Sequence, residues 1–140
     1  MQFFPKKVLH RKWHTMRRNP ARSRLENRGS VLAFGSFGLK AVGEARVRSN
    51  QVEAARKVIA RSLGKTGKTW VRIFPDMPYT QKPAEVKMGK GKGEPAGYHV
   101  QVWPGRILFE VDGIADASAR EALRKAGTKL PMKTKVVSRA

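Results

Sequence analysis

Tyr98–Val111 (YHVQVWPGRILFEV) is the stretch that says most about the fold. Apolar and polar side chains alternate over residues 98–103, which is typical of a strand with one buried face. Pro104 and Gly105 favour a turn, and residues 106–111 then predict a returning strand. We therefore expect residues 98–111 to form a β-hairpin.

A helix is expected on the N-terminal side of this hairpin, over residues 50–63. Its apolar residues recur at helical spacing and would form one buried stripe. Asn50 is expected to cap the helix, Glu53 to complete a capping box, and Gly64 to end it. The stripe consists of Val52, Ala55, Ile59 and Leu63.

A second helix is expected on the C-terminal side of the hairpin. It would begin at Asp116 and stop before Pro131, because proline cannot continue a helix. Most of the apolar residues of this helix are alanines. Its apolar stripe consists of Ala119, Leu123, Ala126 and Leu130.

The remaining segments predict strands and loops around these elements. Residues 31–42 are apolar but contain Gly35 and Gly38, so they predict two short strands or one bent strand. We expect further strands over residues 68–74, 84–88 and 132–137, a rigid proline-rich loop over 75–83, and a flexible Gly/Lys loop over 88–97. Helices and strands do not alternate strictly. The prediction is therefore one α+β domain over residues 31–140: a compact, mixed, largely antiparallel sheet with two helices.

Residues 1–30 differ in composition from this domain and predict a basic N-terminal arm. They contain Pro5 and Pro20, no sustained apolar periodicity, and Glu26 as the one acidic residue. We expect the arm to become ordered on its partner. Aromatic residues among the cations favour RNA, because rings stack on bases while cations meet phosphates. These aromatic residues are Phe3, Phe4 and Trp13.

The charge of the chain indicates the class of partner. Lys and Arg number 30 against 10 Asp and Glu, a formal net charge of +20. So large an excess favours a polyanionic partner, either a nucleic acid or an anionic membrane surface. The chain contains no cysteine, which excludes disulfides and thiol chemistry, and no apolar run of the ~20 residues that span a bilayer. A membrane-surface protein would need a long amphipathic helix with large apolar residues, which the second helix does not offer.

Lys87–Gly93 (KMGKGKG) is the segment most indicative of a specific role. Glycine at alternate positions allows close approach and positive φ, and the lysines between them supply point charges. Such a loop can lie along a phosphate backbone. An exposed hairpin tip that lysine merely keeps soluble is the alternative interpretation.

No enzyme site is evident. Residues 64–69 (GKTGKT) resemble a phosphate-binding loop, but Ser62 stands where its first glycine is needed, and a strand follows instead of a helix. His10 and His14 lack further ligands nearby in the sequence, so we predict no metal site. The acidic residues are scattered and form no nucleophile–base set. We therefore predict that the protein is not an enzyme and needs no cofactor.

Several short segments follow one another in an order that resembles a known family, the bacterial-type large-subunit ribosomal protein sixteen. They run through nearly the whole chain, and their ordered set is specific although each alone is weak. They are Phe34–Ala41 (FGSFGLKA), Gln51–Arg56 (QVEAAR), Trp70–Asp76 (WVRIFPD), Lys82–Pro83, Met88–Gly93 (MGKGKG), Pro104–Gly105 and Leu130–Lys133 (LPMK).

The resemblance implies a structural protein of the large ribosomal subunit that leaves catalysis to RNA. Its expected partners are large-subunit rRNA, tRNA in the aminoacyl and peptidyl sites near the peptidyl-transferase region, and neighbouring ribosomal proteins. It also implies a role in late subunit assembly, one copy per subunit without homo-oligomers, and a ribosome-bound place in the cytoplasm of a bacterium, with an organelle-encoded protein as the alternative. The family's own arm begins near residue 1, which favours an uncleaved N-terminus over a mitochondrial presequence.

The resemblance also implies which residues meet RNA. The loop expected to face tRNA and functional RNA consists of Lys87, Met88, Gly89, Lys90, Gly91, Lys92 and Gly93. The residues expected to bind rRNA are Lys6, Lys7, Arg11, Lys12, Arg17, Arg18, Arg22, Arg24, Arg28, Lys40, Arg46, Arg48 and Arg56.

Some positions depart from the family pattern. Lys87 stands where arginine is usual, so the hydroxylation known at that arginine is not carried over. Glu44 and Ala45 interrupt a run that is cationic in the family. Two other functions remain open from the residues alone: a free-standing nucleic-acid binder, which would fractionate away from ribosomes, and an RNA-directed enzyme, which would turn over substrate when pure.

Overall fold

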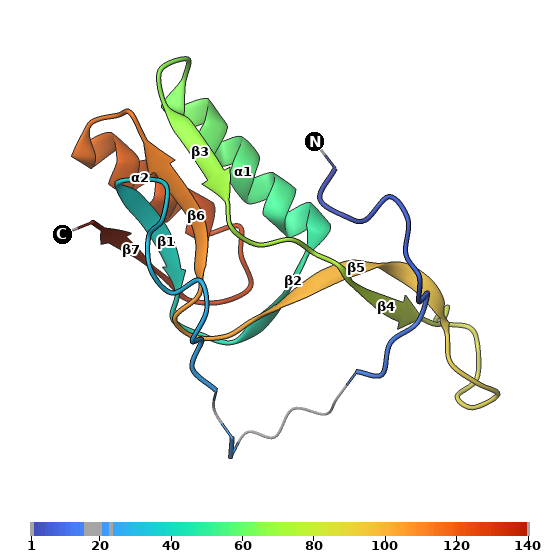
Figure 1. Cartoon of the computed structure of the whole chain (residues 1–140). Coiled ribbons are helices and arrows are strands. Elements are labelled where there is room, and N and C mark those ends of the chain that lie inside the picture. The colour runs from blue at the N-terminus through green and yellow to red at the C-terminus, as the bar shows by residue number, and fades with distance from the viewer. Residues whose placement is uncertain (1, 16–20, 23, 140) are drawn as a thin grey trace.

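A computed structural model describes residues 2–15, 21–22 and 24–139. Two helices lie on one face of a four-stranded sheet of order β3-β6-β1-β7, and a three-stranded sheet of order β2-β5-β4 extends away from it (Figure 1). All strand pairs are antiparallel, so the predicted α+β class is confirmed. The elements are β1 Phe37–Ala41, β2 Ala45–Arg48, α1 Ser49–Leu63, β3 Lys68–Val71, β4 Met77–Gln81, β5 Glu94–Val102, β6 Ile107–Asp112, α2 Asp116–Gly127 and β7 Thr134–Ser138.

The core lies between the helices and the four-stranded sheet. The predicted stripes of both helices are buried in full, although Leu130 of the second stripe lies beyond the end of α2. These side chains pack with Leu39, Phe109 and others from the sheet. Burial of each large apolar side chain is worth about 1.5–3 kcal/mol, so this layer supplies most of the stability.

The predicted hairpin over residues 98–111 is wrong, although both of its strands exist. β5 belongs to the small sheet and β6 to the large one. The end of β1 takes the place that a hairpin partner would occupy: Ala41 donates to the carbonyl of Arg106 and accepts from Gly105, at 2.8 Å in each case. Residues 103–106 therefore form the corner where the chain passes between the sheets. The burial of β6 on both faces agrees with its central position.

The proline-rich segment 75–83 was expected to be a loop, but it contains the edge strand β4. Pro78 is tolerated there because an edge strand leaves one row of backbone groups without a ladder partner. No strand forms over residues 84–88, and β5 begins already at Glu94. The connection between β4 and β5 is thus residues 82–93, shifted towards the N-terminus from the predicted 88–97.

The helix ends were predicted in part. Gly64 ends α1 with φ +62°, and α2 begins at Asp116, as expected. The capping box is shifted, because the side chain of Gln51 accepts a hydrogen bond of 2.9 Å from the backbone of Arg48. Asn50 and Glu53 therefore lie inside the helix. α2 stops at Gly127, well before Pro131.

Shorter strands than predicted form at three places. One strand, β1, forms within residues 31–42, and the part before it is an irregular segment. β3 ends at Val71 and β7 covers Thr134–Ser138, so each differs from its predicted range by a few residues.

Among the described residues, no helix combines the length and the hydropathy that a membrane crossing requires.

Candidate RNA-binding surface

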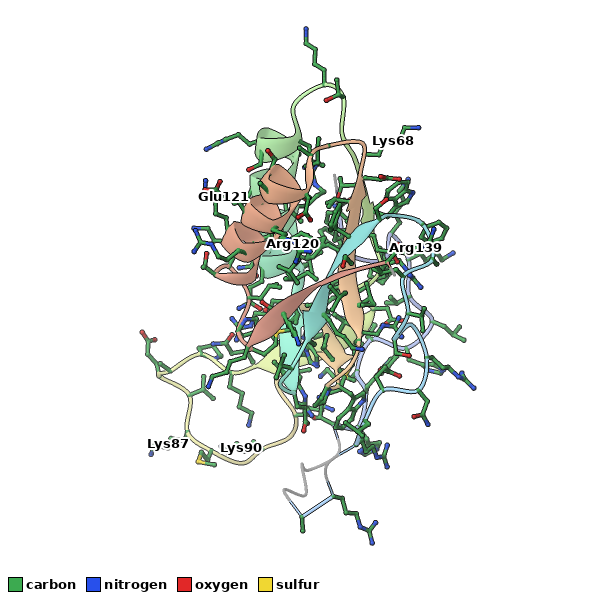
Figure 2. The ribbon with its side chains drawn as sticks, turned by 90° about the vertical axis from the view of Figure 1, so that its left-hand side faces the viewer. Lys68, Lys87, Lys90, Arg120, Glu121 and Arg139 are labelled. Atoms are coloured by element: carbon green, nitrogen blue, oxygen red, sulfur yellow. The ribbon has the colours of Figure 1, made fainter. Side chains whose placement is uncertain are left out.

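A clamp centred on Glu110 holds residues 32–36 against the large sheet. The ribbon of this segment lies on the side of the sheet away from the helices (Figure 2). The carboxylate is fully buried and accepts backbone N–H bonds from Phe34 at 2.6 Å, Gly35 at 2.7 Å and Ala33 at 3.1 Å. Phe34 and Gly35 donate to Oε2, whereas Ala33 and Arg72 donate to Oε1. Burial alone would raise the pKa of Glu110, but the hydrogen bonds from Gly35, Ala33, Phe34 and Arg72 outweigh it and lower the pKa. Glu110 is thus held as a carboxylate.

Two glycines make this close approach possible. A Cβ on Gly35 would lie 2.5 Å from the carbonyl oxygen of Val111, and one on Gly38 would lie 2.3 Å from Cδ2 of Leu32. Neither glycine has a positive φ, so glycine is required for space and not for backbone conformation. Gly35 and Gly38 are therefore needed so that residues 32–36 can pack closely on the sheet.

Three arginines complete the clamp from the sheet side. Arg139 donates to the carbonyls of Leu32 at 3.4 Å and Ala33 at 3.2 Å, and Arg106 donates to that of Arg28 at 3.0 Å. Figure 2 places Arg139 on the same side of the sheet as this segment. Arg72, Arg106 and Arg139 therefore stabilise the fold itself. None of the three, nor Glu110, was singled out from the sequence, although an acid within the apolar run 107–111 is an indication of a buried charge.

The predicted Gly/Lys loop lies at the tip of the β4–β5 hairpin and projects from the body (Figures 1 and 2). Gly89, Lys90 and Gly91 all have positive φ, at +96°, +58° and +95°. A Cβ on Gly89 or Gly91 would meet nothing within 4 Å. Met88 is 98% exposed, and Lys87, Lys90 and Lys92 are exposed as well. The loop thus presents Lys87 and Lys90 to solvent. Lys92 donates to the backbone carbonyl of Trp13 in the arm, and the carbonyl of Gly89 accepts from Lys82.

The described part of the basic arm runs beside the small sheet. Phe3 is buried in the core, and Phe4 stacks on Tyr98 with ring centroids 6.1 Å apart. Lys12 lies 3.5 Å from the carboxylate of Glu94, at the base of the loop. That the arm becomes ordered only on RNA stays a prediction. Every arm cation that the structure describes is exposed: Lys6, Lys7, Arg11, Lys12, Arg22, Arg24 and Arg28. Arg17 and Arg18 lie outside the described residues.

Arg46 and Arg48 are brought together on the outer face of β2, where both are exposed. Arg46 donates to Gln101 at 3.0 Å, and the guanidinium of Arg48 lies 5.2 Å from the ring centre of Tyr79. His99 is buried beneath Tyr79. Burial and the charges of Arg46 and Arg48 lower the pKa of His99, so its imidazole is kept neutral.

Lys40 and Arg56 are less accessible than the other predicted rRNA-binding residues. Lys40 is half-buried in β1, between β6 and β7. Arg56 is also half-buried and donates to Glu53 at 2.8 and 3.0 Å, a pairing that lowers the pKa of Glu53. Their contribution to RNA binding stays a prediction. The other predicted cations that the structure describes lie on the arm, on β2 and on the loop, and the arm meets the loop where Lys92 donates to the carbonyl of Trp13.

Within residues 2–15, 21–22 and 24–139, no group of three or more His, Cys, Asp or Glu side chains is arranged to hold a metal. His10 and His14 are both exposed in the arm. The two buried polar or charged residues of this part of the chain are Glu110, which centres the clamp, and His99, which lies beneath Tyr79. The accessible chemistry of the described surface is therefore that of cations, aromatic rings and backbone amides.

Comparison with known proteins identifies the family. Residues 5–137 match the family model described as ribosomal protein L16p/L10e. The chain is 50% identical over 135 residues to the large ribosomal subunit protein uL16 of Afipia carboxidovorans and 49% identical to that of Nitrobacter winogradskyi, with 96% of both chains covered in each case. It is 55% identical over 111 residues to the uL16 of Caulobacter vibrioides, covering 79% of this chain and 78% of that one. The chain therefore belongs to the L16p/L10e family of ribosomal proteins.

Proposed function

We propose that this protein is a structural constituent of the large ribosomal subunit that binds rRNA through its arm and β2 and positions tRNA with the loop at residues 87–93. Membership of a ribosomal protein family makes the chain a ribosomal component and not an enzyme. Like its bacterial relatives, it is a ribosome-bound protein of the cytoplasm. Its partners accordingly include rRNA and other ribosomal proteins.

The loop is the observation that carries the tRNA part of the proposal. Three consecutive residues with positive φ, Gly89 to Gly91, open the backbone at the tip of a projecting hairpin. Exposed lysines on that tip supply charge without the fixed geometry of arginine, which suits a phosphate backbone that moves. tRNA is such a ligand, because it passes through the ribosome while rRNA stays in place.

The arm and β2 support the rRNA part of the proposal. Their exposed cations neutralise phosphates and release counterions, which makes binding dependent on salt. Exposed Trp13 lies in the arm among the cations, where its ring can stack on an unpaired base. Membership of the family also supports a role late in subunit assembly.

The rRNA role can be tested on large subunits from which this protein has been removed. Wild-type protein should bind such particles, with an affinity that falls as salt rises. Replacing Lys6, Lys7, Arg11 and Lys12 by alanine should flatten the slope of log K against log salt by about 0.7–0.9 for each phosphate that the arm no longer neutralises. An unchanged slope would contradict rRNA binding by the arm, and absence of wild-type binding would contradict the ribosomal role.

The tRNA role needs a separate variant, Lys90→Ala/Lys92→Ala. It should enter the subunit and fold normally, yet weaken tRNA binding at the aminoacyl site and slow translation. Lys129→Ala/Lys135→Ala removes the same charge from exposed positions elsewhere and is the matched control. Ribosomes with the loop variant that bound tRNA and translated as well as the control would rule out the loop's role.

A further inference from the structure

Phe34 presents an aromatic ring that the fold has no evident need to expose. Its residue is 55% exposed. The ring lies stacked against Trp70, with centroids 6.1 Å apart and planes inclined by 16°. The guanidinium of Arg72 lies 5.2 Å from the same ring centre. Trp70 and Arg72 are two residues apart on one extended segment, so both support the ring from one face of the sheet.

The clamp fixes the backbone that carries this ring. The N–H of Phe34 donates to Glu110 at 2.6 Å, and the flanking N–H groups of Ala33 and Gly35 bind the same carboxylate. A fully buried carboxylate is costly to maintain, because several hydrogen bonds must offset its desolvation. Here three of those bonds come from the consecutive backbone N–H groups of Ala33, Phe34 and Gly35. The ring is therefore held in place before any partner arrives.

The surroundings of the ring are cationic. Arg72 lies against the ring, and Arg139 donates to the carbonyls of Leu32 and Ala33 just before Phe34. A guanidinium has five N–H groups, so both arginines keep donors for a further acceptor. The two acids of β6 are already engaged: Glu110 binds the three amides, and Asp112 accepts from Ser36 at 2.9 Å. A rigid ring among cations suits a base stacked on the ring, with its phosphate near arginine.

We infer that Phe34, supported by Trp70 and Arg72, is a stacking platform for an unpaired nucleobase of large-subunit rRNA. This inference rests on the proposed function and adds a site to it on the face of the sheet opposite the helices. The charge decides for RNA over a protein partner. An apolar protein surface would leave the remaining N–H groups of Arg72 and Arg139 without acceptors, whereas a nucleotide supplies a π-face and a phosphate together.

Three variants separate the π-face of Phe34 from its bulk. Phe34→Leu keeps apolar contact with Trp70 and removes the ring, Phe34→Tyr keeps the ring, and Val31→Ala trims another exposed apolar residue of the same segment. Each is bound to large subunits from which the native protein has been removed. We expect Phe34→Leu to weaken binding by roughly 5- to 150-fold, the range measured for loss of one stacked base. Phe34→Tyr and Val31→Ala should bind as wild type does.

Ultraviolet cross-linking provides a readout that altered folding would not imitate. A base stacked on Phe34 should form an adduct on the tryptic peptide 29–40, localised to Phe34 by fragmentation. Its yield should fall in Phe34→Leu and persist in Phe34→Tyr. Wild-type binding by Phe34→Leu, absence of the adduct, or cross-links from Phe34 to another ribosomal protein would each overturn the platform while leaving the ribosomal role intact. Failure of wild-type protein to bind the particles would overturn both.

Discussion

Two glycine-rich segments of this chain use glycine for opposite reasons. In residues 33–38 (AFGSFG), Gly35 and Gly38 have ordinary φ and no room for a side chain. In residues 88–93 (MGKGKG), Gly89 and Gly91 have positive φ and empty space around them. The first segment is therefore packed tightly against the sheet, and the second is open to solvent at Gly89 and Gly91, although Gly93 at its end packs closely on Gln81. Similar composition thus produces a structural clamp in one place and a candidate contact surface in the other.

The cations of the two regions differ in the same way. Arg72, Arg106 and Arg139 donate to fixed acceptors of the clamp, namely Glu110 and the backbone carbonyls of Arg72 and Ala33. Lys87 and Lys90 extend into solvent at the tip of the hairpin (Figure 2). Arginine suits the clamp because its planar fork binds several fixed acceptors, and lysine suits the loop because its charge is mobile. A net charge of +20 therefore includes cations that also stabilise the fold and offer a partner only their remaining N–H groups.

Glu110→Gln should have the largest effect on stability. It leaves Arg72 without its charge partner and places an amide N–H₂ where backbone N–H groups or Arg72 need an acceptor. Breaking a buried pair in this way costs about 3–5 kcal/mol of unfolding free energy, measurable by urea denaturation. Asp116→Asn breaks an exposed pair with Arg120 and should cost about 1 kcal/mol or less. Equal losses would show that Glu110 is not central to the clamp.

Gly35→Ala should have the second largest effect on stability. Overpacking costs roughly 1–3 kcal/mol of unfolding free energy, and we expect a loss at the upper end of this range. The new Cβ would meet backbone atoms of Val111, which cannot move without disturbing the central strand β6. Gly38→Ala should cost less, since it meets the end of the Leu32 side chain, and Leu32→Ala should relieve it in a double-mutant cycle. A Gly35→Ala protein as stable as wild type would mean that the segment is not tightly packed.

Acid should weaken the clamp selectively. The pKa of Glu110 is lower in the folded chain than its ordinary value near 4.5, so its stabilisation is present above that value and lost as pH falls through the folded pKa. The difference in unfolding free energy between wild type and Glu110→Gln should therefore narrow below about pH 4.5, by at most about 1.4 kcal/mol for each pH unit. A constant difference from pH 6 to pH 3 would show that the carboxylate's charge is irrelevant.

Gly89→Ala should have the smallest effect on stability. Its φ of +96° disfavours alanine, but no atom obstructs the new Cβ and the loop can relax in solvent. We expect a loss of about 1 kcal/mol or less, read from the same urea curves as Gly35→Ala. A loss of unfolding free energy as large as that of Gly35→Ala would contradict the view that Gly89, unlike Gly35, has room for a side chain.

The elements whose side chains alternate or recur with a clear period could be predicted from the sequence. Both helices, β6, most of β5 and the exposed Gly/Lys loop belong to this group. The pairing of β5 and β6 could not be predicted, because a Pro-Gly turn looks the same whether the strands pair or separate into two sheets. β4 was missed because Pro78 weighs against a strand unless its edge position is known.

The candidate site was predicted unevenly for a similar reason. The arm and loop cations follow directly from composition, since exposed charge needs no tertiary information. The clamp depends on interactions between residues far apart in sequence, such as Gly35 with Glu110 and Ala33 with Arg139. Phe34 could be recognised as a platform only once its exposure and its stacking on Trp70 were known.

Sedimentation of the untagged protein from a cell extract tests the central claim most directly. The extract is run on a sucrose gradient after a wash at raised salt, and the protein is counted against other large-subunit proteins by mass spectrometry. We predict that it stays in the large-subunit and whole-ribosome peaks at about one copy per subunit, because clustered phosphate contacts resist moderate salt. Release to the top of the gradient, or spread over all nucleic acid, would contradict the ribosomal role and indicate a general nucleic-acid binder.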